Sequence, residues 1–303
     1  MSAPSETKVG FVGLGAMGRP MAARVAGAGF PLSVLDRDTQ RAGAIAAEIE
    51  ASWAKSGAGV AADADLIITI LPTSANVSDA LSGAEGILAG LKPGAIVIDM
   101  TSGNPTDTKA LAARVAEAGG TLIDCPVSGG VPRAITGQLA IMAGGDPSAI
   151  DRAEPLLLSM GASIMRTGPV GSAHAMKALN NLNSAGSFLL AVETLIIGQR
   201  FGLDPALMVD VLNASTGMSS SSQRKLKQFV LNRAFNAGFG MDLMVKDLGI
   251  ALGVAQDTAT PAPLSALVRE MWRSAQAMLG PGQDHTAIAR MVETLTGTEL
   301  GQP

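Results

Sequence analysis

Lys8-Val-Gly-Phe-Val-Gly-Leu-Gly-Ala-Met-Gly18 is the stretch that decides the fold of this 303-residue chain. It opens as a short apolar strand and runs, through the spacing Gly-x-Gly-x-x-Gly, into a helical pattern over residues 17–28. In that spacing we expect Gly13 to make a tight turn and Gly15 to let a pyrophosphate approach the backbone, while Gly18 lets the helix pack against the strand. The amides at such a helix start attract phosphate, so the stretch predicts a nucleotide-binding turn.

A second apolar run, residues 31–35, predicts the next strand, and it ends at Asp36, 18 residues beyond Gly18. A carboxylate in this window accepts hydrogen bonds from the adenosine ribose of a dinucleotide. An ordinary aspartate at a strand end is the alternative, but the glycines, the strand, the helix and the acid together favour a dinucleotide site. The cofactor-binding residues predicted from this segment are Gly13, Leu14, Gly15, Ala16, Met17, Gly18, Asp36 and Arg37.

The acid also bears on the choice of cofactor. A carboxylate at Asp36 pairs with a free ribose 2′-hydroxyl and repels a 2′-phosphate, which favours NAD over NADP. The neighbouring Arg37 could soften that repulsion.

The chain up to about residue 166 alternates short β-branched runs with alanine-rich helical stretches. Strands are expected at 8–12, 31–35, 66–71, 95–99, 121–124, 139–142 and 163–165, and helices around 17–28, 39–50, 105–118 and 148–159. This alternation predicts an α/β domain, residues 1–166, with a mostly parallel, doubly wound sheet that binds ligands at the carboxyl ends of its strands.

Beyond residue 166 the strand pattern disappears and the chain is expected to be all-α. Helical patterns cover 173–201, 205–214, 220–233, 241–257, 262–279 and 285–295. The sequence therefore predicts a second domain, residues 167–303, with the long 173–201 helix bridging the two parts.

Composition excludes several classes of protein. A net charge of −4 without a basic cluster argues against nucleic acid as a partner. The single cysteine, Cys125, rules out an intramolecular disulfide framework and fits a reducing compartment. No basic-then-apolar signal precedes Lys8 and no apolar run reaches membrane-spanning length, so we expect a soluble, cytoplasmic protein. With 47% apolar and 16% charged residues, we also expect extensive surfaces buried between domains or subunits.

Lys177 stands near the start of the long helical stretch, after the break at 168–172. At helical spacing Lys177, Asn181 and Ser184 fall at i, i+4 and i+7 and share one face. A lysine in such apolar surroundings either reaches for solvent or lines a cleft, and the fragment alone favours solvent. The predicted dinucleotide site makes the cleft interpretation more plausible, because a desolvated lysine flanked by amides can accept and donate a proton.

Two short segments follow predicted strands and should lie at the cofactor-facing edge of the sheet. Leu71-Pro72 and Thr101 belong to these segments, whose hydroxyls and amides either contact ribose and nicotinamide or simply cap loops. Ser128-Gly129-Gly130 follows a third strand and could form an anion nest for a substrate carboxylate, or an ordinary turn.

Other polar residues leave alternatives open. Lys246 with Asp247 is either a solvated helix face or a cation for cofactor or substrate. His174, one helical turn before Lys177, either orients the lysine or caps and packs. Two histidines and scattered carboxylates support neither a metal site nor a Ser-His-Asp triad, and Cys125 is expected to be a buried thiol rather than a nucleophile.

Four motifs together, 13–18, 124–130, 168–181 and 246–248, resemble those of the β-hydroxyacid dehydrogenase family over essentially the whole chain. The resemblance implies a Rossmann-like domain joined by a long helix to an all-α domain that mediates assembly into a homodimer or homotetramer. It implies these roles: Lys177 as the catalytic acid/base, Ser128, Gly129 and Gly130 for the substrate carboxylate, Asn181 for the substrate, and Thr101 and Lys246 for the cofactor.

The chain departs from the family pattern in two places. Gly171-Ser-Ala stands where the family has Gly-x-Gly, and Val131-Pro-Arg-Ala134 follows the Ser-Gly-Gly motif, where Arg133 adds a charge or points to solvent. The departures leave the substrate open, with selectivity expected near 219–223 and Lys246.

The function expected from the sequence is an NAD-preferring oxidoreductase that interconverts a small β-hydroxy acid and its semialdehyde. An imine reductase of the same architecture and a nucleotide-binding sensor without turnover are the alternatives.

Overall fold

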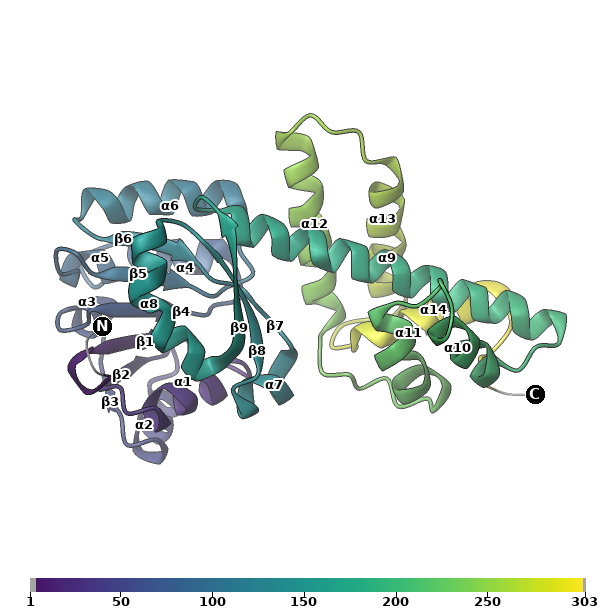
Figure 1. The fold of residues 1–303 in the computed structure, drawn as a ribbon, viewed down its shortest axis with the longest axis horizontal. Helices are drawn as coiled ribbons and strands as arrows, with labels where there is room; N and C mark the ends of the chain where they lie inside the picture. Colours follow the sequence, from purple (N-terminus) through teal and green to yellow (C-terminus); the bar gives the residue numbers. More distant parts are fainter. Residues whose placement is uncertain (1–3, 302–303) are drawn as a thin grey trace. The chain divides into compact units, whose positions relative to one another are not determined.

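The computed structural model describes residues 4–301, which divide into two compact units, one ending at Lys177 and one beginning at Ala178. The first unit contains a nine-stranded sheet (Figure 1). Its strands are β1 (Val9–Val12), β2 (Leu32–Leu35), β3 (Ser52–Trp53), β4 (Leu66–Thr69), β5 (Ile96–Asp99), β6 (Thr121–Asp124), β7 (Val127–Ser128), β8 (Leu139–Gly144) and β9 (Gly161–Gly168). All seven predicted strands are confirmed, and the sequence missed only the two-residue strands β3 and β7.

The strand order is β3-β2-β1-β4-β5-β6-β8-β7, with β9 paired to β8. Strands β1 to β6 are mutually parallel, whereas β8 runs antiparallel to β6 and parallel to β9. The doubly wound, mostly parallel sheet is thereby confirmed. Because the parallel strands end at one edge, the residues that follow β1, β2, β4, β5 and β6 all meet there.

Helices cover both faces of the sheet in this unit (Figure 1). One face carries α1 (Gly18–Gly27), α2 (Thr39–Glu48), α7 (Gly130–Thr136) and α8 (Pro147–Met160). The other carries α3 (Gly57–Ala61), α4 (Ser74–Leu81), α5 (Ile87–Gly90) and α6 (Pro105–Glu117). A short 3₁₀ turn, η1 (Pro4–Glu6), precedes β1. The predicted helices correspond to α1, α2, α6 and α8; the other four are short, and the strand and helix periods did not reveal them.

Alternation along the buried strands explains the two layers of core. In β5, Ile96 and Ile98 pack with the α1 layer, while Val97 points to the α6 layer. Both faces of each central strand are therefore apolar, as expected for parallel strands covered on both sides.

Capping residues explain where the longer helices begin. The side chain of Asn104 accepts the amides of Thr106 and Asp107 at the start of α6, and Asp146 accepts that of Ala149 in α8. A proline occupies the first position of both helices, where its missing N–H costs nothing.

The second unit is helical (Figure 1), as predicted. Helix α9 (Ser172–Phe201) enters it, followed by α10 (Pro205–Asn213), α11 (Ser220–Arg224), the π-helical η2 (Leu226–Leu231), α12 (Met241–Asp257), α13 (Pro263–Leu279), the 3₁₀ turn η3 (His285–Ala287) and α14 (Ile288–Thr296). Helices α12 and α13 lie side by side. Phe188 of α9 and Trp272 of α13 are fully buried in the core of this unit.

One helix prediction is wrong in detail. The stretch 220–233 was expected as one helix, but it breaks at Lys225, whose backbone (φ −127°, ψ −43°) leaves the α-helical region, and continues as η2. The wider π turn still buries Leu226 and Val230, four residues apart, so their spacing could not reveal the break. Among residues 4–301, no helix is both long enough and apolar enough to cross a bilayer.

The glycine turn provides a test of the packing. A methyl group on Gly18 would overlap the carbonyl oxygen of Gly13, whereas one on Gly27, in the same helix, would meet no atom within 4 Å. We expect Gly18→Ala to lower the free energy of unfolding by more than about 1 kcal/mol, because the backbone must shift. Gly27→Ala should be neutral or stabilising by up to about 1 kcal/mol through helix propensity. Urea unfolding of both variants measures the difference, and equal effects would contradict the packing described.

Candidate active site

The turn after β1 has the conformation and the space expected of a phosphate-binding loop. Gly13 has a φ of +102°, and a side chain there would overlap the carbonyl oxygen of Ile70. Gly15 faces open space, with no atom within 4 Å of the position of a Cβ. The turn thus leaves room at Gly15 for a bulky group to reach the backbone, which fits a dinucleotide.

Asp36 lies at the end of β2, held against this turn. Its Oδ2 accepts the amide of Leu14 at 2.7 Å, and its Oδ1 accepts the amide of Asp38 at 2.9 Å and a guanidinium N–H of Arg41 at 3.0 Å. Burial would raise the pKa of Asp36, but these hydrogen bonds and the charge of Arg41 hold it below its usual value. The carboxylate is therefore charged at neutral pH. Arg37 is exposed, and the partner Arg41 was missed because it follows five residues later in α2.

The neighbouring loops at the same edge join in a second hydrogen-bonded group. The hydroxyl of Thr101 accepts the amide of Leu71 at 3.1 Å, so its own proton remains for another acceptor. Asp99 accepts the amide of Thr101 at 3.1 Å and the hydroxyl of Thr69 at 3.0 Å. The structure thus brings together Leu71 and Thr101, while Pro72 is exposed beside them. Asp99 was not among the residues predicted for the site from the sequence.

Ser128 ends β7 and is followed by two glycines with positive φ, +133° at Gly129 and +67° at Gly130. A side chain on Gly129 would overlap the aliphatic part of Arg133, which folds back over it from α7. Gly129 and Arg133 are both exposed, and Ser128 and Gly130 are partly exposed.

Asp124, at the end of β6, accepts the amides at the start of α9. Its Oδ1 accepts from Gly171 at 2.7 Å and its Oδ2 from His174 at 2.9 Å. The carboxylate is fully buried and faces the positive end of a 30-residue helix. A side chain on Gly144 would come within 2.8 Å of Oδ1, so that glycine allows the close approach.

His174 is buried, and its hydrogen bonds settle its tautomer. The hydroxyl of Thr108 donates its one proton to the carbonyl of Asn104 at 2.8 Å, so it accepts from Nδ1 of His174 at 2.7 Å. Nδ1 therefore acts as the donor in this contact, and Nε2 is buried with no hydrogen-bond partner among residues 4–301. The side chain packs against the loop at Gly103, which fits the packing interpretation of this histidine.

Lys177 is buried in the second turn of α9. The start of that helix is held to β6 by Asp124, at the same edge of the sheet as the glycine turn. Within the first unit, Lys177 thus lies on a helix that starts at the edge of the sheet where the predicted cofactor-binding residues gather.

Asn181 belongs to the second unit, and its side chain is positioned by Asp247. Its Nδ2 donates to Oδ2 of Asp247 at 2.6 Å, which fixes the orientation of the amide because a carboxylate only accepts. Lys246, half-buried in α12, lies 3.4 Å from the other oxygen of Asp247. The sequence named Asp247 only as the neighbour of Lys246, because its partner Asn181 lies 66 residues away along the chain.

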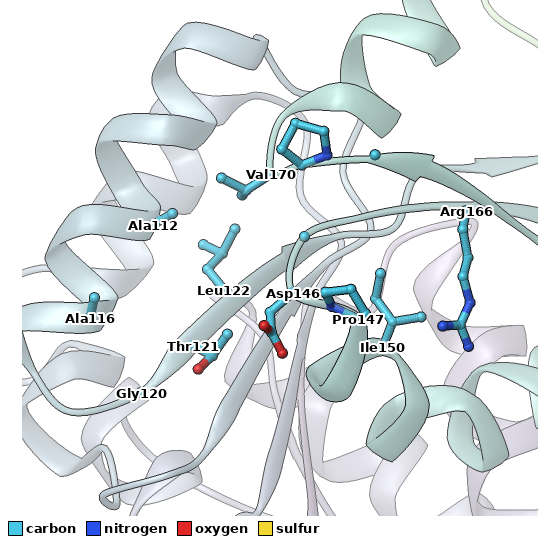
Figure 2. A pocket seen from close by; sticks show the side chains of 13 residues that line it. Ala112, Ala116, Gly120, Thr121, Leu122, Asp146, Pro147, Ile150, Arg166 and Val170 are labelled. Carbon is cyan, nitrogen blue, oxygen red and sulfur yellow. The ribbon is translucent and has the colours of Figure 1, made fainter.

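Figure 2 shows a pocket whose lining includes none of the predicted site residues. It is lined by α6, by the first residues of β6 and by Asp146 and Arg166, at the amino ends of the parallel strands rather than their carboxyl ends. Arg166 is already paired with Asp151 and Glu154. We therefore do not assign the chemistry to this pocket.

Cys125, the single cysteine, is fully buried. Burial and the charges of Asp124 and Asp99 raise the pKa of Cys125 well above its usual value, so the thiol stays protonated. Within residues 4–301, no three acids, histidines or cysteines cluster as a metal site would require.

Two family models together match most of the chain. A family model described as the NAD binding domain of 6-phosphogluconate dehydrogenase matches residues 8–168. A second, described as NAD-binding of NADP-dependent 3-hydroxyisobutyrate dehydrogenase, matches residues 171–292.

Individual relatives are similar over nearly their whole length. Human mitochondrial 3-hydroxyisobutyrate dehydrogenase is 39% identical over 90% of this chain and 82% of its own. The 2-(hydroxymethyl)glutarate dehydrogenase of Eubacterium barkeri is 33% identical over 97% of both chains. The structure of 3-hydroxyisobutyrate dehydrogenase from Mycobacterium tuberculosis with L-serine has a TM-score of 0.88 and 30% identity, covering 94% of this chain and 99% of that one.

The Asp124 cap can be tested by stability. Asp124→Ala removes the acceptor of two amides at a buried helix start, and we expect the free energy of unfolding to fall by about 2–4 kcal/mol. Asp124→Asn keeps one acceptor oxygen and should lose less. Urea unfolding followed by circular dichroism measures both, with Asp63→Ala, at an exposed carboxylate, as the control within about 0.5 kcal/mol of the parent. An Asp124→Ala protein as stable as the control would contradict the role of the cap.

Proposed function

The chain belongs to the β-hydroxyacid dehydrogenase family and is an NAD(P)-dependent oxidoreductase, and we propose that Lys177 is the acid/base with which it interconverts a β-hydroxy acid and its semialdehyde. One observation carries the proposal: the buried Lys177 sits in the second turn of a helix whose start is bound to the ligand-binding edge of the sheet.

The residues at that edge fit a dinucleotide. The open space at Gly15 and the amides before α1 would hold the pyrophosphate, and Asp36 the adenosine ribose. Thr101, with its free proton, and Lys246 would contact the rest of the cofactor. The nicotinamide, when bound, takes up or returns the hydride of the reacting carbon.

Proton transfer falls to the protein. In the oxidative direction, the neutral amine of Lys177 accepts the hydroxyl proton of the substrate while a hydride leaves the carbon that bears this hydroxyl. In the reductive direction, the ammonium form gives a proton to the developing alkoxide.

Other side chains orient the substrate. Asn181, its amide fixed by Asp247, keeps a second N–H with which to hold the hydroxyl or carbonyl oxygen. The amides of Ser128, Gly129 and Gly130 would hold the substrate carboxylate. Fixing both groups lowers the entropic part of the barrier.

The relatives point to a substrate class. The names 3-hydroxyisobutyrate and 2-(hydroxymethyl)glutarate both describe acids with a hydroxymethyl group on the carbon next to the carboxylate. For this chain we propose substrates with the same hydroxymethyl-carboxylate unit.

We propose NAD as the preferred cofactor, since Asp36 is charged and would repel a 2′-phosphate. The exposed apolar side chains of Leu190, Ile197 and Phe201, on one face of α9, support assembly into a homodimer or homotetramer. The single, buried Cys125 supports a location in the reducing cytoplasm.

Lys177→Met tests the acid/base assignment. We expect kcat to fall by about 10²–10⁴-fold, the usual contribution of positioned acid/base catalysis. Binding of NADH, followed by its fluorescence, should persist. Lys55→Met, at an exposed lysine of the first unit, is the matched control. Near-normal turnover in Lys177→Met would overturn the assignment, and NADH binding by the parent protein without turnover of any hydroxymethyl acid would favour a sensor.

Asp36→Ser tests the cofactor preference. Removing the carboxylate should shift the ratio of kcat/KM for NADP against NAD toward NADP by at least about tenfold, or 1.4 kcal/mol. Steady-state kinetics with both cofactors measure the ratio. A parent protein that already prefers NADP, or a ratio unmoved by the substitution, would refute the role of Asp36.

A further inference from the structure

Lys225 is a half-buried lysine that the proposed mechanism does not use. It stands at the break between α11 and η2, with both adjoining helical segments ending at its non-helical backbone. The flanking Leu226 and Val230 are fully buried, which anchors this segment in the core of the second unit. Such π-helical irregularities are frequent at functional sites.

The ammonium group lies over one face of α9. Its Nζ is 3.5 Å from the hydroxyl oxygen of Ser184 and 5.5 Å from the ring centroid of Phe188. A hydroxyl engages one of the three N–H donors of a lysine, and an aromatic ring offers only a partial substitute for a counter-charge.

No carboxylate among residues 4–301 lies within ion-pair distance of this ammonium. Burial lowers the pKa of Lys225, and Asp284 opposes that shift only in part. Asp284 is itself engaged: it accepts the amides of Gly238, Phe239 and Thr286 and the hydroxyl of Thr286. Lys225 therefore has N–H donors to spare and no carboxylate within ion-pair distance among the described residues.

Its place on α9 relates it to the substrate. Asn181 and Ser184 are three residues apart on that helix, and Phe188 follows at the next turn, so all three share one face. The Nζ of Lys225 thus lies about one helical turn beyond the amide that we assign to the substrate.

We propose that Lys225, with the hydroxyl of Ser184, forms a second anion-binding subsite that receives a distal anionic group, a carboxylate or a sulfonate, on the substituent of the hydroxymethyl acid. The inference rests on the proposed function, since it names the substrate class of the same site. A lysine binds as a point charge, so the subsite selects for negative charge rather than for the shape of one oxyanion.

A matched pair of acids tests the subsite. 2-(Hydroxymethyl)glutarate carries the distal carboxylate, and 2-(hydroxymethyl)butanoate is the same molecule without it. For the parent protein we expect a higher kcat/KM on the diacid. In Lys225→Met the ratio of kcat/KM for diacid against monoacid should fall about 10- to 100-fold, the worth of a hydrogen bond to a charged group. The change should fall mainly on KM, because the distal group does not react.

Two further variants complete the test. Lys227→Met removes the same charge two residues away, where the lysine is paired with Asp210, and should leave the ratio unchanged. Lys225→Arg keeps a cation and should retain most of the preference. Thermal unfolding of each variant shows whether it folds. A sulfonate in place of the distal carboxylate should behave like the diacid.

The outcomes separate the two proposals. An unchanged ratio in Lys225→Met, or an equal fall in Lys227→Met, overturns the subsite while turnover itself upholds the proposed function. If the parent turns over neither acid, the proposed function fails. Calorimetric binding of the diacid with NADH present then decides the subsite: binding that weakens at least tenfold in Lys225→Met supports it, and binding that is absent or unaffected overturns it.

Discussion

The contact on which the site depends is the pair of hydrogen bonds from the start of α9 to the buried carboxylate of Asp124. A fully buried charge is costly unless it is well paired, and here the amides and the dipole of a long helix supply the compensation. Because Asp124 ends a central strand, the first turns of α9 are bound to the sheet, and Lys177 with them. In the proposed reaction Lys177 exchanges protons with the substrate, and this requires that the helix carrying it is rigidly attached.

A buried carboxylate that accepts hydrogen bonds also occurs at each of the other points where chemistry is proposed. Asp36 holds the glycine turn through Leu14, Asp99 holds Thr101, and Asp247 orients Asn181. In a chain with few charged residues, these carboxylates act as fixed acceptors for backbone and side-chain donors rather than as surface charges. Lys225 is the exception that motivates the second subsite, since it is a cation without a comparable partner.

Much of this could be predicted before the structure. The strand and helix periods identified seven strands and the long helices, because burial imposes a repeat of two or 3.6 residues on the chain. The two-residue strands, the short helices and the break at Lys225 were missed because they are too short to show a period. The cap at Asp124 was missed for another reason: its partners lie 47 and 50 residues away, and no local pattern records a contact over that distance.

The sequence by itself determined the glycine turn, the acid at the end of the second strand and the alignment of Lys177, Asn181 and Ser184 on one helix face, because each is a matter of spacing along the chain. Only the tertiary structure decided which acid steadies each of these groups, which tautomer His174 adopts and which lysine is left without a counter-charge. Those outcomes depend on donors and acceptors brought together from distant segments, and a buried polar group is defined by the partner that it finds there.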